Sequence, residues 1–200
     1  MKLEASIDHV IDALRPEASA HRAAIERFLG LVDTWNAKID LTAARTADAL
    51  ADVMLAVALV MADEDFVPSG AHLLDVGSGA GGPALPLALV RPDVRVTMVE
   101  PLGKRVAFLR TAVGALGLAP RVGIVQARAD ALGDLHADVA SARATFPPHE
   151  WLTIGSTLAP RVLVLTTTDD VPTTPASARR DYRWPHSGAP RVLLRFDRAP

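Results

Sequence analysis

The chain has 200 residues, half of them hydrophobic, and a formal net charge of −2, which suits one globular domain of ordinary size. It contains no cysteine, so disulfides and thiolate metal sites are excluded, and its six histidines lack ligand spacing, so we expect no metal. No apolar run approaches the roughly 20 residues of a membrane span, and the N-terminus lacks the pattern of a signal peptide. We therefore expect a cytoplasmic protein with no membrane partner.

The first third of the chain is predicted to be helical. An apolar stripe recurs every three or four positions, at Ile25, Phe28, Val32, Trp35 and Ile39. Residues 48–62 form a second expected helix with Asp48 as its N-cap, and the Pro-Ser-Gly run at 68–70 then breaks the chain. The sequence thus predicts an N-terminal helical extension over residues 1–70.

Beyond residue 70, apolar strand-like runs alternate with helical stretches. The expected strands lie at residues 72–76, 95–100, 122–126, 138–141 and 161–165. The expected helices between them lie at residues 83–90, 103–116 and 149–158. This order predicts an α/β fold over residues 71–200, with a mostly parallel, doubly wound, Rossmann-like sheet.

The C-terminal segment has the pattern of a hairpin. Residues 181–185 and 191–196 flank a Pro-His-Ser-Gly-Ala-Pro turn, and residues 166–176 are rich in Thr, Pro and Ser, as in a loop. We therefore expect the parallel sheet to finish with antiparallel edge strands.

A glycine-rich turn, GSGAGG at residues 77–82, follows the first expected strand. Its spacing fits both the dinucleotide fold and the S-adenosylmethionine (SAM) fold, since glycines let the backbone approach a nucleoside in either. A turn with a purely structural role is the third interpretation. The glycines alone do not decide among these readings.

Acidic residues at strand ends favour SAM. Asp75 precedes Gly77 by two residues, where a negative charge suits the amino group of SAM and not a pyrophosphate. Glu100 ends the second strand and suits ribose hydroxyls in both folds, whereas Asp130 follows the third strand, where SAM folds commonly grip the adenine. The sequence therefore predicts a class I SAM-dependent methyltransferase fold.

The chain resembles the glucose-inhibited division protein B (RsmG) family, which methylates guanine N7 in small-subunit ribosomal RNA. The residues that carry the resemblance are WNAKIDLT at 35–42, DVGSGAGGPALPLA at 75–88, GKRVAFL at 103–109, RAD at 128–130 and SARA at 141–144. The resemblance implies SAM as cofactor and ribosomal RNA or the small subunit as partner. We expect a monomer.

The resemblance also implies residue roles. The cofactor-binding set is Asp75, Gly77, Ser78, Gly79, Gly81, Glu100, Ala129 and Asp130. On the substrate side it implies Lys104, Arg105 and Arg143, with Arg143 also the catalytic residue. An unpaired base needs a stacking surface, for which Phe146 and Trp151 are the expected residues.

Several family features are missing on the substrate side. The His-x-x-Asp-Ser-Leu run is replaced by residues 52–57, an apolar or aromatic residue by Gly82, and a Lys-Gly pair by Thr166 and Thr167. Two alternatives therefore stay open: a small-molecule acceptor, and a non-catalytic SAM- or nucleoside-binding paralogue. Guanine N7 needs no general base, whereas an oxygen acceptor does, with candidates His136, His149 and Asp138.

Overall fold

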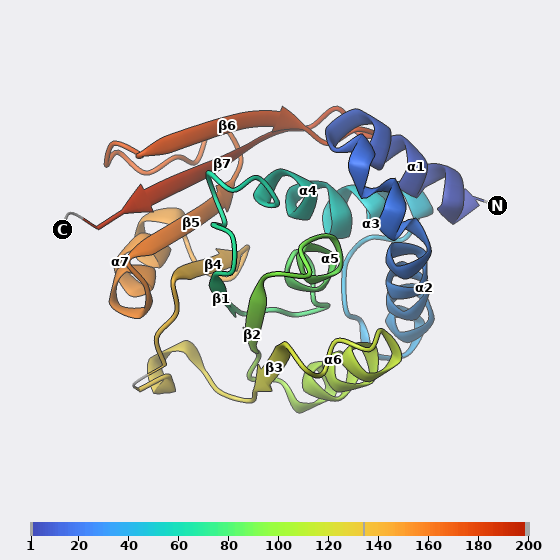
Figure 1. The fold of residues 1–200 in the computed structure, drawn as a ribbon, viewed down its shortest axis with the longest axis horizontal. Helices are drawn as coiled ribbons and strands as arrows, with labels where there is room; N and C mark the ends of the chain where they lie inside the picture. Colours follow the sequence, from blue (N-terminus) through green and yellow to red (C-terminus); the bar gives the residue numbers. More distant parts are fainter. Residues whose placement is uncertain (1, 134, 199–200) are drawn as a thin grey trace.

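The computed structural model describes residues 2–133 and 135–198, and a sheet of seven strands lies at their centre (Figure 1). Residues 1 and 200, the outer limits of the two predicted regions, lie outside this description. The strands are β1 His72–Val76, β2 Arg95–Val99, β3 Val122–Val125, β4 Val139–Arg143, β5 Arg161–Thr166, β6 Ala178–Arg183 and β7 Pro190–Asp197. The five predicted parallel strands are confirmed, with ends that shift by one or two residues.

The strand order is β3-β2-β1-β4-β5-β7-β6. Strands β1 to β5 pair in parallel, whereas β7 is antiparallel to both β5 and β6. The predicted antiparallel hairpin at the edge is confirmed. The chain order reverses between β1 and β4, and ligands of open α/β sheets bind at the carboxyl ends of the strands beside such a switch point.

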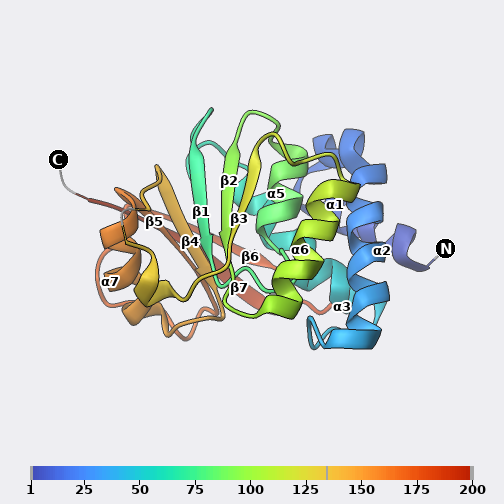
Figure 2. The same ribbon diagram turned by 90° about the horizontal axis from the view of Figure 1, so that it is seen from below.

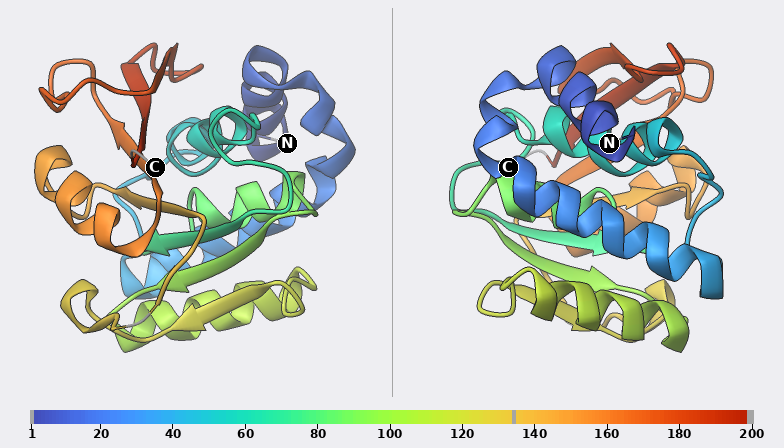
Figure 3. Two further views of the ribbon diagram at one scale, coloured as in Figure 1. Left: turned by 60° about the vertical axis from the view of Figure 1, so that its left-hand side comes forward. Right: turned by 90° about the vertical axis from the view of Figure 1, so that its right-hand side faces the viewer.

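Helices cover the two faces of the sheet unequally (Figure 2). Helix α7, Pro148–Leu158, packs on β4 and β5 on one face. On the other face, α5, Ala84–Val90, and α6, Gly103–Ala115, pack on β2 and β3. Helix α2, Arg22–Ile39, crosses outside α5 and α6, as the right-hand view of Figure 3 shows.

The N-terminal helices begin earlier than the sequence pattern indicates. Helix α1, Lys2–Leu14, was not predicted, and a 3₁₀ turn over Pro16–His21 joins it to α2. The expected helix at 48–62 consists of α3 Ala47–Ala51, a π-helical turn over Asp52–Ala56 and α4 Val57–Met61.

The N-cap of α3 is Thr46 and not the predicted Asp48, because the Thr46 hydroxyl accepts a hydrogen bond from Ala49 N at 3.1 Å. Asp48 lies in the first turn instead and accepts a hydrogen bond from the Ser6 hydroxyl at 2.5 Å.

Alternating side chains of each strand enter two hydrophobic cores. Leu73 and Leu163 point into the larger core, which also holds Ile25 and Phe28 of α2, whereas Leu74 points into the core under α7. The helices of residues 1–70 therefore share one core with the sheet, and the division at residue 70 stays a prediction. No helix of the described residues is long and apolar enough to cross a membrane.

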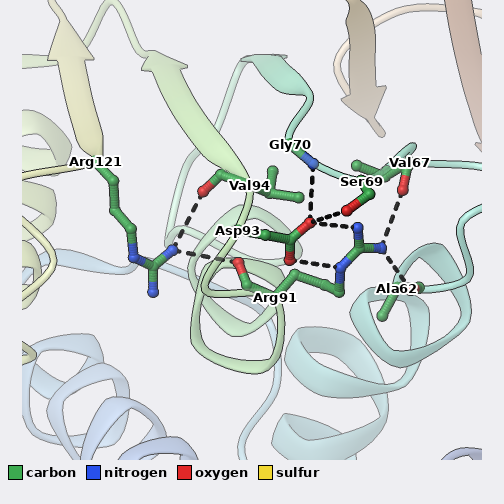
Figure 4. A network of polar contacts seen from close by, with 8 residues as sticks. All are labelled: Ala62, Val67, Ser69, Gly70, Arg91, Asp93, Val94 and Arg121. Atoms are coloured by element: carbon green, nitrogen blue, oxygen red, sulfur yellow. Dashed lines mark hydrogen bonds and ion pairs between the residues drawn. The ribbon is translucent and has the colours of Figure 1, made fainter.

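A buried arginine joins two loops at the amino end of the sheet (Figure 4). Arg91 donates to the carbonyls of Ala62 and Val67 at 2.9 and 3.0 Å, and it forms an ion pair with Asp93 at 2.7 Å. Asp93 also accepts a hydrogen bond from Gly70 N at 3.0 Å, and the Arg91 guanidinium holds the pKa of this carboxyl well below its usual range. The network fixes the end of α4 to the start of β1, opposite the edge where a ligand would bind.

Candidate active site

The glycine-rich loop leaves the carboxyl end of β1 beside the switch point. Gly77, Gly79 and Gly81 have φ angles of 76°, 54° and 81°, in the left-handed region where glycine has no steric penalty. The backbone folds back on itself, since Gly81 N donates to Ser78 O at 2.7 Å. This sharp turn explains the three glycines in the motif.

The end of β2 holds this loop in place. Gly77 N donates to Val99 O at 2.8 Å, and Gly79 N donates to a carboxylate oxygen of Glu100 at 2.9 Å. The other oxygen of Glu100 accepts a hydrogen bond from Leu102 N at 2.9 Å. Glu100 is only 2% exposed, so this predicted ribose ligand also organises the loop.

A pocket of about 420 Å³, here called the cofactor pocket, lies over the ends of β1, β2 and β3. The residues that line it are Val76, Gly77, Val99, Pro101, Ala127, Arg128, Ala129, Asp130, Thr145, Phe146, Glu150 and Ile154. Gly77, Ala129 and Asp130 were predicted to bind cofactor, and the structure brings these three together. Apolar walls with a few carboxylates are typical of small-molecule sites.

Bare backbone at Gly77 is a requirement of this pocket. A Cβ atom there would lie 2.3 Å from Oγ1 of Thr145, which follows β4 on the far side of the switch point. Thr145 and Glu150 were missed by sequence reasoning because neither belongs to a recognisable motif. Thr145 follows β4 and Glu150 lies in the first turn of α7. A systematic inspection of the residues after each predicted strand would have included both.

Asp75 and Ser78 lie beneath the loop. The Asp75 carboxylate is 2% exposed and accepts a hydrogen bond from the Ser141 hydroxyl at 2.8 Å, while Ser78, 4% exposed, donates to Asp75 O at 2.9 Å. Burial raises the pKa of Asp75 above its usual value. Neither side chain lines the cofactor pocket, so their contact with cofactor stays a prediction.

Arg143 bridges the glycine loop and the π-helical turn. Its guanidinium donates to Val53 O at 2.6 Å and to Gly82 O at 2.9 Å, and burial lowers its pKa. A Cβ on Gly82 would meet Met54 Sδ at 2.7 Å, so glycine here lets the turn approach the loop. The Asp52–Ala56 segment, where the RsmG pattern is lost, therefore contacts Gly82, where a second residue of that pattern is lost.

Comparisons with known proteins decide the family. Residues 21–163 match the family of rRNA small subunit methyltransferase G. The chain belongs to this family. A relative of that name from Halorhodospira halophila is 46% identical over 123 residues, which are 62% of this chain and 57% of the relative. Another, from Anaeromyxobacter dehalogenans, is 37% identical over 143 residues, 70% of this chain and 66% of the relative.

The match thus spans less than two thirds of the length of these relatives.

Solved structures support the fold. An O-methyltransferase from Bacillus cereus in complex with SAH aligns with a TM-score of 0.62 and 14% identity, over 86% of this chain and 91% of the other. An RNA methyltransferase from Salinibacter ruber with S-adenosyl-L-homocysteine aligns at 0.56 and 18%, over 70% and 87%. The predicted class I SAM-dependent methyltransferase fold is confirmed.

Of the three cations predicted on the substrate side, Arg143 lines a pocket, whereas Lys104 and Arg105 line none of those found in the described residues. Lys104 is exposed and Arg105 half-buried in the first turn of α6, and neither forms an ion pair within residues 2–133 and 135–198. Neither lines the cofactor pocket. Cations oppose the helix dipole at an N-terminus, so their unpaired state at the carboxyl edge is compatible with an anionic partner.

Two expectations about side chains near the site are wrong. Trp151 is not a stacking surface: it is 2% exposed, and its indole donates to Leu163 O at 2.8 Å. Asp138 lies before β4, at the opposite edge, where its carboxylate accepts a hydrogen bond from His72 N at 2.7 Å. His136 and His149 line none of the pockets found in the described residues, whereas Phe146 does line the site.

Proposed function

We propose that this protein is a SAM-dependent methyltransferase that modifies guanine N7 in the RNA of the small ribosomal subunit. The family supports the reaction class. The single observation that carries the proposal is the cofactor pocket, where the bare backbone of Gly77 at the end of β1 and the Ala129–Ala131 turn after β3 line one cavity beside the switch point. The cavity of about 420 Å³ has the mostly apolar lining with a few carboxylates that a small molecule needs, and glycine is required at residue 77 because a side chain there would collide with Thr145.

The residues of the pocket suit the parts of SAM. Backbone at Gly77 would border the methionine end, and Ala129 with Asp130 would border the adenine. Glu100 does not line the pocket, but it lies at the end of β2 directly below it, and its carboxylate would accept ribose hydroxyls, since each oxygen keeps a second lone pair beyond its hydrogen bond to the backbone. Val76, Val99 and Ile154 exclude water from the apolar surface of the bound molecule.

Methylation at N7 requires no general base from the protein. When bound, SAM would supply a methyl group on a sulfonium leaving group, which the N7 lone pair can accept. N7 carries no proton to remove, so the lack of a histidine in the pocket is no obstacle. The chain would act by positioning the two reactants and by excluding water.

Further parts of the proposal concern partners and organisation. Lys104 and Arg105 would contact RNA phosphates, and Arg143 would fix the loops between the reactants. We propose a cytoplasmic monomer that needs neither metal nor membrane, with residues 1–70 as a helical extension of the methyltransferase region 71–200.

The test is transfer of labelled methyl groups from SAM to small ribosomal subunits or to naked ribosomal RNA, followed by mapping of the modified base. Label at one guanine N7 is the expected result. No label on either substrate, with SAM bound normally, would reject the RNA acceptor.

A small-molecule acceptor is the second candidate, favoured by the net charge of −2 and by Thr166 and Thr167 in place of Lys-Gly. It predicts activity insensitive to salt, whereas RNA binding weakens steeply as salt rises. Absence of any SAM affinity in calorimetry would support a non-catalytic paralogue.

A further inference from the structure

A second pocket of about 310 Å³, here called the aromatic pocket, opens at the ends of β4 and β5. It is lined by Val57, Arg143, Ala144, Phe146, Pro148, Leu165, Thr166, Thr167, Asp170, Tyr182, Trp184 and Arg191. Three of these side chains are aromatic in a chain with only 4% aromatic residues. Their concentration at one site calls for a role beyond filling the core.

The aromatic pocket adjoins the cofactor pocket. Phe146 lines both pockets. Of the two residues before it, Ala144 lines the aromatic pocket and Thr145 lines the cofactor pocket. Ala144 has a φ of 53°, a left-handed conformation that is costly for alanine and is often retained at functional sites. The two pockets therefore meet at Phe146, and a planar group in the aromatic pocket would lie beside the bound cofactor.

The far wall comes from the C-terminal hairpin, which lies beside β5 in the left-hand view of Figure 3. Tyr182 and Arg191 are paired in the β6–β7 register, and the Arg191 guanidinium lies 3.7 Å from the centre of the Trp184 ring. All three residues follow residue 163, where the match to the family ends. This wall of the aromatic pocket therefore lies outside the segment that matches the family.

We propose that the aromatic pocket receives the unpaired guanine that is methylated, and that Asp170 selects guanine by accepting hydrogen bonds from its Watson–Crick edge. The inference rests on the proposed function and names the acceptor site of that reaction. Enzymes that modify a base take it out of the stack, hold it between aromatic and apolar side chains and recognise its Watson–Crick edge.

The chemistry of the lining favours guanine over other bases. Guanine is the common base with two adjacent N–H donors on that edge, at N1 and N2, and a carboxylate has two acceptor oxygens and no donor. Asp170 is exposed and lines the aromatic pocket but not the cofactor pocket, so the opposite edge of the base, which carries N7, would face the cofactor.

Tyr182 adds a donor to this pocket. Burial raises the pKa of its hydroxyl to about 12, although Arg143 and Arg191 act in the opposite direction, so the group is protonated at neutral pH. Its hydroxyl makes no hydrogen bond to another part of the chain that the structure describes, and it is therefore available to a carbonyl oxygen such as O6. A pocket of 310 Å³ is at the lower end of the range for ligand sites, which suits one base better than a stretch of chain.

The experiment measures binding of guanosine 5′-monophosphate, with the adenosine nucleotide for comparison, to the full chain saturated with S-adenosylhomocysteine. Asp170→Asn and Tyr182→Ala are the test variants, and Asp169→Asn is the matched control, since Asp169 is an exposed neighbour outside the pocket. We expect Asp170→Asn to lose about tenfold in affinity for the guanine nucleotide, as for the loss of a two-point contact with a base, and Tyr182→Ala, which loses one hydrogen bond and a ring, to lose about as much. The control should bind as wild type does.

The same variants are then assayed for methylation of ribosomal RNA and for S-adenosylhomocysteine affinity. We expect a higher KM for RNA with unchanged cofactor affinity, a pattern that a merely structural role would not produce. Wild-type nucleotide binding and RNA KM in Asp170→Asn would overturn the inference, as would a wild-type chain that binds no guanine nucleotide. A chain that binds guanine through Asp170 but methylates no RNA would sink the proposed function and leave the pocket standing.

Discussion

The cofactor pocket and the aromatic pocket share Phe146, yet they are built in different ways. The first depends on backbone: three glycines with positive φ and amides fixed by the buried carboxylate of Glu100. The second depends on side chains from β4, β5 and the C-terminal hairpin. A backbone site tolerates few changes, whereas a side-chain site can be altered residue by residue.

This difference explains where the chain keeps the RsmG pattern and where it departs from it. Gly82 replaces a larger residue, and the π-helical turn at Met54 occupies the adjoining space. Thr166 and Thr167 stand where the pattern has Lys-Gly, and both line the aromatic pocket. The departures therefore change the acceptor side and the last residue of the glycine loop, and they leave Gly77, Gly79 and Gly81 in place.

The largest expected effect is that of Gly77→Ala. The left-handed φ costs alanine about 1–2 kcal/mol, and overlap of its Cβ with Thr145 adds about 1–3 kcal/mol. Relief of this overlap moves the loop that lines the cofactor pocket, so we expect SAM affinity to fall about a hundredfold. Calorimetry with SAM checks it.

Gly117→Ala is the control, because Gly117 also has a positive φ, 68°, but no atom lies within 4 Å of the added Cβ. Gly117→Ala should lose about 1–2 kcal/mol of unfolding free energy through the left-handed φ alone. It should keep its SAM affinity. Equal SAM affinity in Gly77→Ala would show that the loop does not form the cofactor site.

A smaller loss is expected for Arg143→Lys, which tests the boundary between the pockets. A lysine cannot bridge Val53 O and Gly82 O as the guanidinium does, so at least one carbonyl loses its donor. We expect a loss of about 1–3 kcal/mol in the free energy of unfolding and a methylation rate lower by about tenfold, with SAM affinity less affected. Thermal unfolding and single-turnover rates measure these effects.

Arg110→Lys, on the exposed surface of α6, is the matched control and should change neither quantity. A variant at Arg143 that is stable but loses only SAM affinity would place this residue in the cofactor site instead.

Much of the fold was predictable because strand and helix patterns are local. The run at β1 is short, apolar and buried along most of its length, the buried residues of α6 recur at helical spacing, and the glycine turn between β1 and α5 follows from its composition. Helix α1 was not delimited within the helical first third, although Leu3, Ile7, Val10, Ile11 and Leu14 recur at helical spacing and three of them are fully buried. Its local pattern therefore supports the helix as well as the stripe of α2 does.

The candidate site was predictable only where backbone chemistry restricts residue type. Gly77 and Asp130 were found because a nucleoside fold needs a glycine and an acid at those strand ends. Trp151 was misjudged since exposure depends on α7 packing over Leu163, and Tyr182 was overlooked because β7 lies between its strand and β5. Long-range pairing of this kind leaves no local pattern.

Asp75→Asn separates a buried structural acid from a cofactor ligand. Burial raises the pKa of Asp75 above the ordinary 3.8, so its contribution to stability is fully present below that value and is lost as pH rises through the folded pKa. Asparagine keeps an acceptor for the Ser141 hydroxyl and carries no charge. We expect the variant to be at least as stable as wild type near pH 7, with the advantage disappearing in acid.

The expected change in SAM affinity is within about twofold, because the side chain does not line the pocket. Urea unfolding at several pH values and calorimetry measure the two quantities. A large loss of SAM affinity in a stable variant would restore Asp75 to the ligands.

The smallest expected effect is that of Lys104→Gln, which tests whether the acceptor side extends beyond the aromatic pocket to the start of α6. A phosphate contact contributes through counterion release, so removal of one cation lowers the slope of log affinity against log salt by about 0.7 for single-stranded RNA. Affinity for RNA falls uniformly across sequences, while SAM affinity is unchanged because Lys104 lies outside the cofactor pocket. Arg95→Gln, also exposed but at the start of β2 on the opposite edge of the sheet, should keep the wild-type slope. If both variants keep it, RNA does not contact Lys104, and the acceptor side ends at the walls of the aromatic pocket.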